Sequence, residues 1–302
     1  MSMMSLFELL LLAAVWGASF LFMRVAAPEM GPIWLIEFRV LVAGLVLLPV
    51  LARAGKLGEL RRFWKPLLIL GIINSALPFI LLAYASVYLP AGLTSILNAT
   101  APLFGIAVAF FWLNEHLSQA RGAGFILGFA GVVILIGWEK GSGASLPITA
   151  VAAALLAAGF YAFGAPYARL KLGGATPLTI ATGSQLGAAF FLLPTLPFSA
   201  PQSSPSFNVL LVALALAVLS TAVAYILYFH LIQNVGSSKA LTVTYLVPLF
   251  AMAWAFLFLS EPITPAMIVG CALILSGTAV ANELFAARLG KRRVSKNQGK
   301  IE

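Results

Sequence analysis

The sequence has little charge, no aspartate, and few histidines or cysteines. Only 9% of its 302 residues are charged, there is no aspartate, and there are two histidines. Soluble domains carry roughly a quarter charged residues, so the composition excludes an ordinary soluble protein. The single cysteine, Cys271, lies inside an apolar run, which excludes a disulfide framework. Since the sequence has no phosphate loop, metal-ligand cluster or nucleophile triad, we expect no catalytic residue, no metal and no cofactor.

Apolar residues are abundant instead. Hydrophobic residues make up 62% of the chain, and the mean hydropathy is +1.03. A run of about 20 apolar residues can cross the hydrocarbon core of a bilayer. The fold class that we expect is an all-α integral membrane protein with ten transmembrane helices, at about 5–25, 32–53, 66–87, 91–113, 119–138, 147–168, 176–198, 207–232, 237–259 and 264–286. The first run lacks a basic flank and a cleavage site, so we expect a retained span and not a signal peptide.

Part of the chain is repeated. Residues 217–281 align without a gap on residues 71–135 at an offset of 146, and glutamates, prolines and glycines coincide as well as apolar residues. Weaker matches extend the repeat to five spans in each half. Because five is odd, the second half must enter from the opposite side, as in the inverted repeats of secondary transporters. We therefore expect a first five-helix repeat at 1–143, a second, inverted repeat at 144–287 and a basic cytoplasmic tail at 288–302.

The basic residues predict the orientation. The net charge is +9, but Lys and Arg lie in short loops and in the C-terminal tail, an arrangement that does not favour nucleic-acid binding. With the N-terminus inside, fifteen of the 18 fall on the cytoplasmic side, as the positive-inside rule requires. Both termini are therefore expected to be cytoplasmic. The expected partners are the lipid bilayer and a small-molecule substrate.

These features resemble the EamA branch of the drug/metabolite transporter superfamily. The resemblance rests on two five-helix repeats, on Trp16-Gly17 in the first span, and on a proline followed 13 residues later by glutamate in spans four and nine. A finer resemblance is to YddG-like exporters of amino acids and metabolites. The chain departs from the family at Asn114 and Ser260, where glycine is common before the glutamate. The resemblance implies a bacterial inner-membrane transporter, not an enzyme, that exports small metabolites, aromatic and other neutral amino acids among them, by alternating access through a central cavity.

Polar side chains inside the spans are costly, so each needs a reason. Several occupy matched positions of the two halves: Asn74-Ser75 and Ser220-Thr221, Tyr84 and His230, Asn98 and Thr244. Matched polar positions indicate a shared interior cavity, and the amides of Asn74 and Asn98 suit a zwitterionic or carboxylate-bearing solute. Hydrogen bonding between helices is the alternative. His230 is a candidate for a proton-responsive group, with a solvated histidine as the alternative.

Aromatic residues and prolines complete the predicted site. Trp16, Tyr161 and Tyr245 lie near mid-span, where they can wall a bulky side chain or merely pack. Pro102 and Pro248 follow Asn98 and Thr244 by four residues. Proline has no N–H and crowds the carbonyl four residues earlier, so each proline should shape its helix and leave that carbonyl free for a substrate ammonium group. The candidate substrate-binding residues are Trp16, Asn74, Tyr84, Asn98, Tyr161, His230, Thr244 and Tyr245.

The remaining conspicuous residues have structural interpretations. Arg39 lies within the second span, and we expect it to pair with Glu37, near Arg24 or with a helix end in preference to binding a substrate carboxylate. Glu115 and Glu261 are expected on opposite membrane faces, each capping the helix that follows it.

The fifth span has rows of glycine that are typical of close helix packing, inside the monomer or at a weak dimer face: Gly122, Gly124, Gly128 and Gly131. We therefore expect a monomer or a weak dimer.

Other functions fit the sequence less well. A multidrug exporter of lipophilic cations is the alternative within the superfamily, and the scarcity of acidic residues inside the spans disfavours it. An intramembrane enzyme would need convergent catalytic side chains, and the inverted repeat disfavours a channel or a scaffold. Since no glutamate is expected at mid-membrane, a carboxylate proton relay has no candidate.

Overall fold

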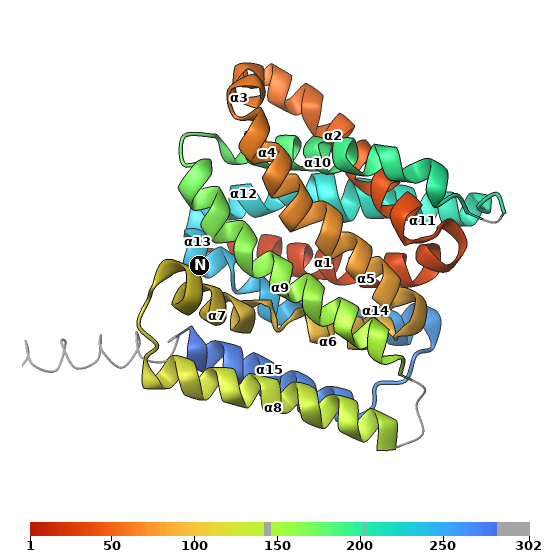
Figure 1. Ribbon diagram of the computed structural model, residues 1–302, viewed down its shortest axis with the longest axis vertical. Coiled ribbons are helices and arrows are strands. Elements are labelled where there is room, and N and C mark those ends of the chain that lie inside the picture. The colour runs from red at the N-terminus through yellow and green to blue at the C-terminus, as the bar shows by residue number, and fades with distance from the viewer. Residues whose placement is uncertain (142–145, 202, 283–302) are drawn as a thin grey trace, which may run out of the picture.

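The computed structural model describes residues 1–141, 146–201 and 203–282. Within these ranges the chain forms helices and no strand. Most of the helices run side by side in one bundle between two ends, left and right in Figure 1. The tail expected at 288–302 lies outside the described residues. The elements are α1 Met3–Met30, α2 Pro32–Arg53, α3 Leu57–Arg62, α4 Trp64–Gly71, η1 Ile72–Ala76, α5 Leu77–Tyr88, α6 Ala91–Asn98, α7 Ala101–Leu113, α8 Gln119–Gly141, α9 Ile148–Lys171, α10 Pro177–Leu192, η2 Leu193–Phe198, α11 Phe207–Ala217, η3 Val218–Val223, α12 Ala224–Val235, α13 Ser237–Ala240, α14 Val243–Leu259 and α15 Pro265–Ala281.

Among the described residues, eight helical segments are long and apolar enough to cross a membrane: Met3–Met30, Pro32–Arg53, Trp64–Tyr88, Ala91–Leu113, Gln119–Gly141, Ile148–Lys171, Pro177–Phe198 and Phe207–Val235. Two shorter apolar helices, Val243–Leu259 and Pro265–Ala281, fall where the last two spans are expected. In the ranges that the structure describes, the protein is thus all-helical and multi-pass, as predicted. The count of ten spans and the inverted arrangement of the two halves stay predictions.

Local chemistry explains where several helices begin. Four of them start after a Ser or Thr whose hydroxyl oxygen accepts a hydrogen bond from a backbone N–H three residues later: Ser2, Thr176, Ser206 and Thr264. Such N-caps satisfy a backbone donor that the helix itself leaves free. Between α1 and α2, Gly31 adopts a φ of 75° and Pro32 opens the next helix. Glycine tolerates that backbone conformation, and proline is favoured in the first turn.

Two departures from regular α-helix recur 146 residues apart. The segments η1 and η3 are both π-helical, and they join α4 to α5 and α11 to α12. Asn114 and Ser260, which end α7 and α14, adopt left-handed φ angles of 53° and 54°. Glycine is the usual residue in that conformation, which explains its frequency there in the family. Since π-helical turns occur often at functional sites, η1 and η3 are candidate parts of a functional site.

The glycines of α8 pack inside the chain. Helices α8 and α15 lie side by side at the lower edge of the bundle (Figure 1). A Cβ atom added to Gly124 would lie 2.5 Å from the carbonyl oxygen of Gly277, and one on Gly131 would lie 3.1 Å from that of Gly270. Only small residues allow helices to approach so closely. Gly122 makes no comparable contact.

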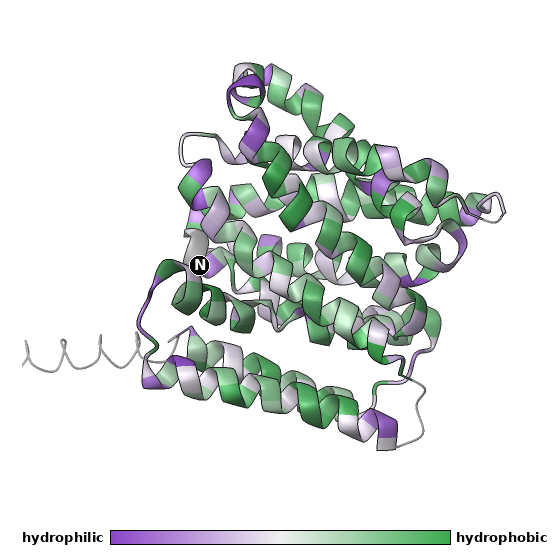
Figure 2. Ribbon diagram, in the orientation of Figure 1, coloured by the Kyte–Doolittle hydropathy of each residue, from purple (hydrophilic) through white to green (hydrophobic). Residues whose placement is uncertain are grey.

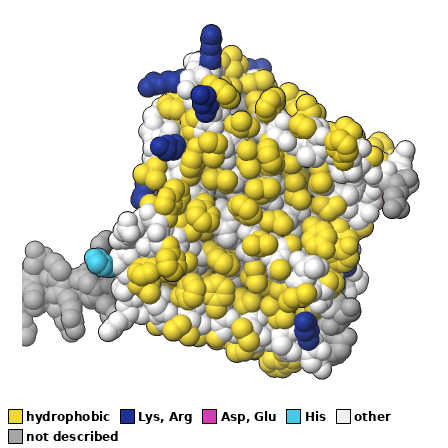
Figure 3. Space-filling view, in the orientation of Figure 1, with side chains coloured by type: hydrophobic (Ala, Val, Ile, Leu, Met, Phe, Trp, Pro, Cys, Tyr) yellow, Lys and Arg dark blue, Asp and Glu magenta, His cyan; other side chains and the backbone are white. Residues whose placement is uncertain are grey.

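The outer surface of the bundle is apolar. Many large hydrophobic side chains are exposed, among them Phe111, Phe190 and Ile126. Hydrophobic residues follow the helices and hydrophilic ones gather toward their ends (Figure 2). In the same view, apolar side chains cover most of the visible face, and Lys and Arg lie near its edges (Figure 3). A surface of this kind suits lipid contact.

Candidate functional site: a central cavity

A cavity of about 340 Å³ lies between the two halves of the chain. Its walls come from α1, α2 and α5 to α7 of the first half, and from α9, α12, α14 and α15 of the second, together with η1 and η3. The volume is near the lower end of pockets that hold small molecules. A cavity of this size can hold a small solute.

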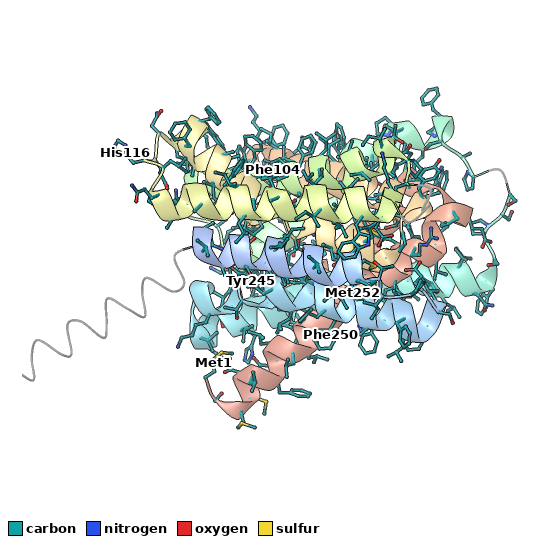
Figure 4. All side chains as sticks on the ribbon, turned by 90° about the horizontal axis from the view of Figure 1, so that it is seen from below. Met1, Phe104, His116, Tyr245, Phe250 and Met252 are labelled. Atoms are coloured by element: carbon teal, nitrogen blue, oxygen red, sulfur yellow. The ribbon has the colours of Figure 1, made fainter. Side chains whose placement is uncertain are left out.

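Six of the eight predicted binding residues line this cavity: Trp16, Asn74, Asn98, Tyr161, Thr244 and Tyr245. Pro102 and Pro248 line it as well. Figure 4 shows Tyr245 and Met252 at successive points along α14, with His116 at one end of the molecule.

Tyr84 and His230 do not line the cavity. The hydroxyl of Tyr84 donates a hydrogen bond to Thr149 Oγ1 at 3.2 Å. His230 Nδ1 lies 3.2 Å from a carboxylate oxygen of Glu8, and 57% of the His230 side chain is exposed. The structure gives these two matched residues partners elsewhere.

The π-helical segments bring polar side chains to the cavity. Asn74 lies in η1, and Ser220 and Thr221 lie in η3. The hydroxyl of Ser220 donates to the backbone carbonyl of Val15 on α1 at 2.8 Å. Asn74 packs so tightly against Gly164 of α9 that a Cβ at position 164 would overlap its amide oxygen. Each π-helical segment therefore binds a neighbouring helix while it faces the cavity.

Asn98 and Thr244 differ although their positions match. Helix α6 ends at Asn98 and α7 begins at Ala101, so the helix breaks just before Pro102. The side-chain oxygen Oδ1 of Asn98 is buried and has no partner among the described residues. Helix α14, in contrast, continues through Pro248, and the hydroxyl of Thr244 donates to the carbonyl of Leu241, in the turn just before the helix, at 2.8 Å. Asn98 is the better placed of the two to bind a ligand.

Aromatic rings form much of the remaining wall. The ring centroids of Trp16 and Tyr228 are 5.2 Å apart, and those of Phe79 and Tyr161 are 6.3 Å apart. All four residues line the cavity. Packed aromatic rings provide a large rigid apolar surface, which suits an apolar or aromatic substrate side chain.

Arg39 is the charged residue of the cavity wall. Arg39 is 5% exposed, and its Nε donates to Thr221 Oγ1 at 2.9 Å. The expected pairing with Glu37 is wrong, since no ion pair joins them in the part of the chain that the structure describes. Side chains two positions apart point to different sides of a helix. Among the described residues that line the cavity, none is a carboxylate.

Two polar residues of the wall were not predicted. Ser95 and Thr278 are each 1% exposed, and their hydroxyl oxygens have no partner among the described residues. Both line the cavity. Their matched positions hold Leu241 and Val132, so a search for polar pairs in the repeat does not find them.

The prediction that Glu261 caps the following helix is wrong. Thr264 caps α15, whereas Glu261 accepts a hydrogen bond from the backbone N–H of Ala91 at 2.8 Å and one from Arg24 Nε at 3.0 Å. The carboxylate therefore joins the α14–α15 link to α1 and to the start of α6. Its sequence partner Glu115 contacts Arg121 of the adjacent helix at 2.9 Å.

Within the described ranges, no group of three or more His, Cys, Asp or Glu side chains is arranged to hold a metal ion. The described residues that line the cavity include one arginine, uncharged polar groups and aromatic rings.

Comparison with known proteins identifies the family. The profile of the EamA-like transporter family matches residues 3–137 and again residues 148–282. The chain is 30% identical over 277 residues to the "Uncharacterized transporter YvbV" of Bacillus subtilis, with 90% of this chain and 89% of that protein covered. It is 27% identical over 307 residues to the "Probable terminal-alkyne amino-acid exporter" of Streptantibioticus cattleyicolor, with 98% of each covered. A solved crystal structure that is 20% identical has the same fold, with a TM-score of 0.67 over 96% of this chain and 99% of that one. The chain belongs to the EamA-like transporter family.

Proposed function

We propose that this protein is a secondary transporter that exports small metabolites, in particular aromatic and other neutral amino acids, from a bacterial cytoplasm by alternating access. The observation that carries the proposal is the cavity, because residues of both halves line it with polar groups next to aromatic rings. A relative of nearly equal length is named as an amino-acid exporter. Reversible binding of a small amphipathic solute between two halves is what such transport requires.

An inverted repeat underlies the proposed mechanism, and contacts between the halves support it. If a two-fold axis relates the halves, each contact between them should recur with its partners exchanged. Gly124 packs on Gly277, and Gly131 packs on Gly270. The offset of 146 converts the first pair into the second. The same offset relates the starts of the π-helical segments η1 and η3.

One contact does not recur, and that difference supports alternating access. At one end of the bundle, Glu261 of the second half holds Arg24 and Ala91 of the first. At the matched position of the other half, Glu115 contacts Arg121 within its own half. We infer that the end with Arg24 is closed and that the end with Glu115 is open. Exchange of these two arrangements would expose the cavity to the other side of the membrane.

Export of lipophilic cations is the alternative function. Sites for such cations rely on carboxylates and aromatic rings. The cavity has the rings but no carboxylate, and it carries Arg39. Repulsion by Arg39 disfavours a cationic substrate.

Counterflow in proteoliposomes tests the proposal. Vesicles loaded with one unlabelled amino acid should accumulate the same labelled amino acid from outside, and vesicles without the protein should not. A panel of neutral amino acids and lipophilic cations distinguishes the two functions. Accumulation of the cations alone would contradict amino-acid transport.

A further inference from the structure

Arg39 is a buried cation without an anionic partner among the described residues. Its guanidinium carbon lies 3.7 Å from the centroid of the Phe79 ring, its Nη1 lies 3.8 Å from the sulfur of Met23, and its Nε donates to Thr221. None of these neighbours is negatively charged. The ion pairs of the described part of the chain involve other basic residues.

The carboxylate closest in sequence does not neutralise Arg39. Glu37 is 4% exposed, and its Oε2 has no hydrogen-bond partner within the described ranges. It does not line the cavity, whereas Arg39 does. A buried charge without a counterion is unfavourable, and more so inside a membrane. Arg39 therefore needs an explanation that the fold alone does not supply.

A corresponding contact in the other half of the chain shows whether the structural role of Arg39 requires its charge. Gln185 on α10 donates from its side-chain nitrogen to Ser75 Oγ in η1 at 3.0 Å. The offset of 146 relates Ser75 to Thr221. Each accepts a hydrogen bond from the second span of the other half, Ser75 from Gln185 on α10 and Thr221 from Arg39 on α2, so the two hydrogen bonds are counterparts. A neutral amide thus makes this contact in the second half. The hydrogen bond that ties the helix to the π-helical segment does not require a charge.

We propose that Arg39 binds the carboxylate group of the transported substrate, an inference that rests on the proposed function and names the substrate class. A guanidinium group presents a planar set of donors that matches a carboxylate. The unpartnered oxygens of Ser95, Asn98 and Thr278 accept hydrogen bonds from the ammonium group of the same solute. Substrates are then small carboxylic acids with an apolar side chain, amino acids among them.

Arg39→Gln tests the proposal, because it gives position 39 the residue that makes the matched contact at position 185. We therefore expect it to fold with nearly unchanged thermal stability. The probes are phenylalanine, phenylacetate and phenethylamine, which carry both charged groups, the carboxylate alone and the ammonium group alone. The leucine, 4-methylpentanoate and 3-methylbutylamine set provides a second side chain. Ligand-induced shifts in unfolding temperature give the apparent Kd for purified protein.

Carboxylate-bearing probes should bind the wild-type protein at least tenfold more tightly than Arg39→Gln, and the amines should bind neither. Arg62→Gln, which removes an exposed arginine outside the cavity, should behave as wild type. Equal affinity of wild type and Arg39→Gln for phenylalanine would overturn the role of Arg39 and leave amino-acid export intact. Binding of phenylacetate but not phenylalanine, lost in Arg39→Gln, would support Arg39 and contradict amino-acid export. Failure of every carboxylate to bind would overturn both.

Two milder variants cover the case in which Arg39→Gln does not fold. Arg39→Lys keeps the charge but loses the planar donor set, and Thr221→Val removes the hydrogen bond that orients the guanidinium group. Each should weaken binding of the carboxylates severalfold. Unchanged carboxylate affinity in both variants would overturn the proposal.

Discussion

Arg24 and Glu261 are 237 residues apart in sequence, yet Arg24 Nε donates to Glu261 Oε1 at 3.0 Å. Arg24 Nη1 also donates to the backbone carbonyls of Ser86 and Val87, at 3.0 and 2.8 Å. One arginine thus joins α1, the end of α5 and the α14–α15 link. We call these contacts, together with the hydrogen bond from the backbone N–H of Ala91 to Glu261, the Arg24–Glu261 lock.

The proposed alternating access requires a counterpart of this lock at the other end of the bundle. Glu115 matches Glu261, and Arg169 lies one residue beyond the counterpart of Arg24 in the weaker upstream alignment. In the structure Glu115 contacts Arg121, and its side chain is 43% exposed against 15% for Glu261. We predict that Glu115 and Arg169 come together when the Arg24–Glu261 lock opens.

The first prediction concerns Asn98. Asn98→Leu should abolish counterflow because it removes the unpartnered oxygen in the cavity. The free energy of unfolding should change by less than about 1 kcal/mol, since the native amide oxygen makes no hydrogen bond that the leucine would lose. Tyr84→Phe, outside the cavity, is the matched control and should transport normally. Normal transport by Asn98→Leu would remove this residue from the site, and loss of folding would favour a packing role.

The second prediction concerns Pro102. Proline cannot donate to the carbonyl of Asn98 four residues earlier. Pro102→Ala restores that donor and allows α6 and α7 to join, so substrate affinity should fall although the ring itself need not touch the substrate. Equilibrium binding to purified protein measures this. Affinity equal to that of the wild type would show that the helix break serves packing alone.

The sequence predicts where several helices begin and end and which polar residues line the cavity. The expected ranges 32–53 and 91–113 coincide with α2 and with α6 and α7, because turns and apolar runs determine where helices begin and end. Polar residues at matched positions pointed to Asn74 and Asn98, which do line the cavity.

The rotation of each helix about its axis could not be predicted. A π-helical turn contains one extra residue, which shifts all later side chains by about 100°. Tyr84 and His230 follow η1 and η3 and do not line the cavity, although their matched positions predict them as binding residues. The partners of Arg39 and Glu261 were missed for a related reason, since both lie in the other half of the chain.

The third prediction concerns topology. Introduced cysteines at Gly58 and Gly173 should react with an impermeant reagent only from the cytoplasmic side, and one at Ser203 only from outside. The expectation follows from the distribution of Lys and Arg. All three positions lie in links between the helices of the bundle. Labelling of Gly58 and Gly173 from opposite sides would contradict the proposed arrangement of spans.

The fourth prediction concerns energy coupling. Since no carboxylate lines the cavity, substrate flux down its own gradient should persist when the proton gradient is collapsed. Proteoliposomes with an ionophore and an imposed substrate gradient measure this. Loss of flux would indicate proton coupling, and His230, which lies 3.2 Å from Glu8, would then be the first residue to replace.

The fifth prediction concerns acid stability. Glu59, in the α2–α4 link, accepts hydrogen bonds from the backbone N–H of Thr176 and from the hydroxyls of Thr176 and Thr179. These bonds lower the pKa of Glu59 from 4.5 to about 2. A lowered pKa in the folded state stabilises the protein above about pH 4.5, and this contribution disappears as the pH falls toward 2.

Glu59→Gln should therefore lower the unfolding temperature at pH 6 and have a smaller effect at pH 3. Glu115→Gln is the control, because Glu115 accepts no backbone hydrogen bond among those observed. An equal effect of Glu59→Gln at both pH values would show that the charge of Glu59 does not hold α3 to α10.

The most direct test of the mechanism measures both ends of the bundle at once. Spin labels at Tyr88 and Pro262 flank the Arg24–Glu261 lock, and the offset of 146 places their counterparts at Asn234 and His116. All four positions are exposed. Glu261→Gln weakens a charge-assisted hydrogen bond, the kind that contributes about 1.5–3 kcal/mol, so it should shift the equilibrium without any substrate.

Double electron–electron resonance on each pair, in a Cys271→Ala background, then compares the wild type with Glu261→Gln. Alternating access predicts that the Tyr88–Pro262 distance gains a longer component while the Asn234–His116 distance gains a shorter one. Lengthening of both distances, or no change in either, would contradict the exchange of two gates around one central cavity.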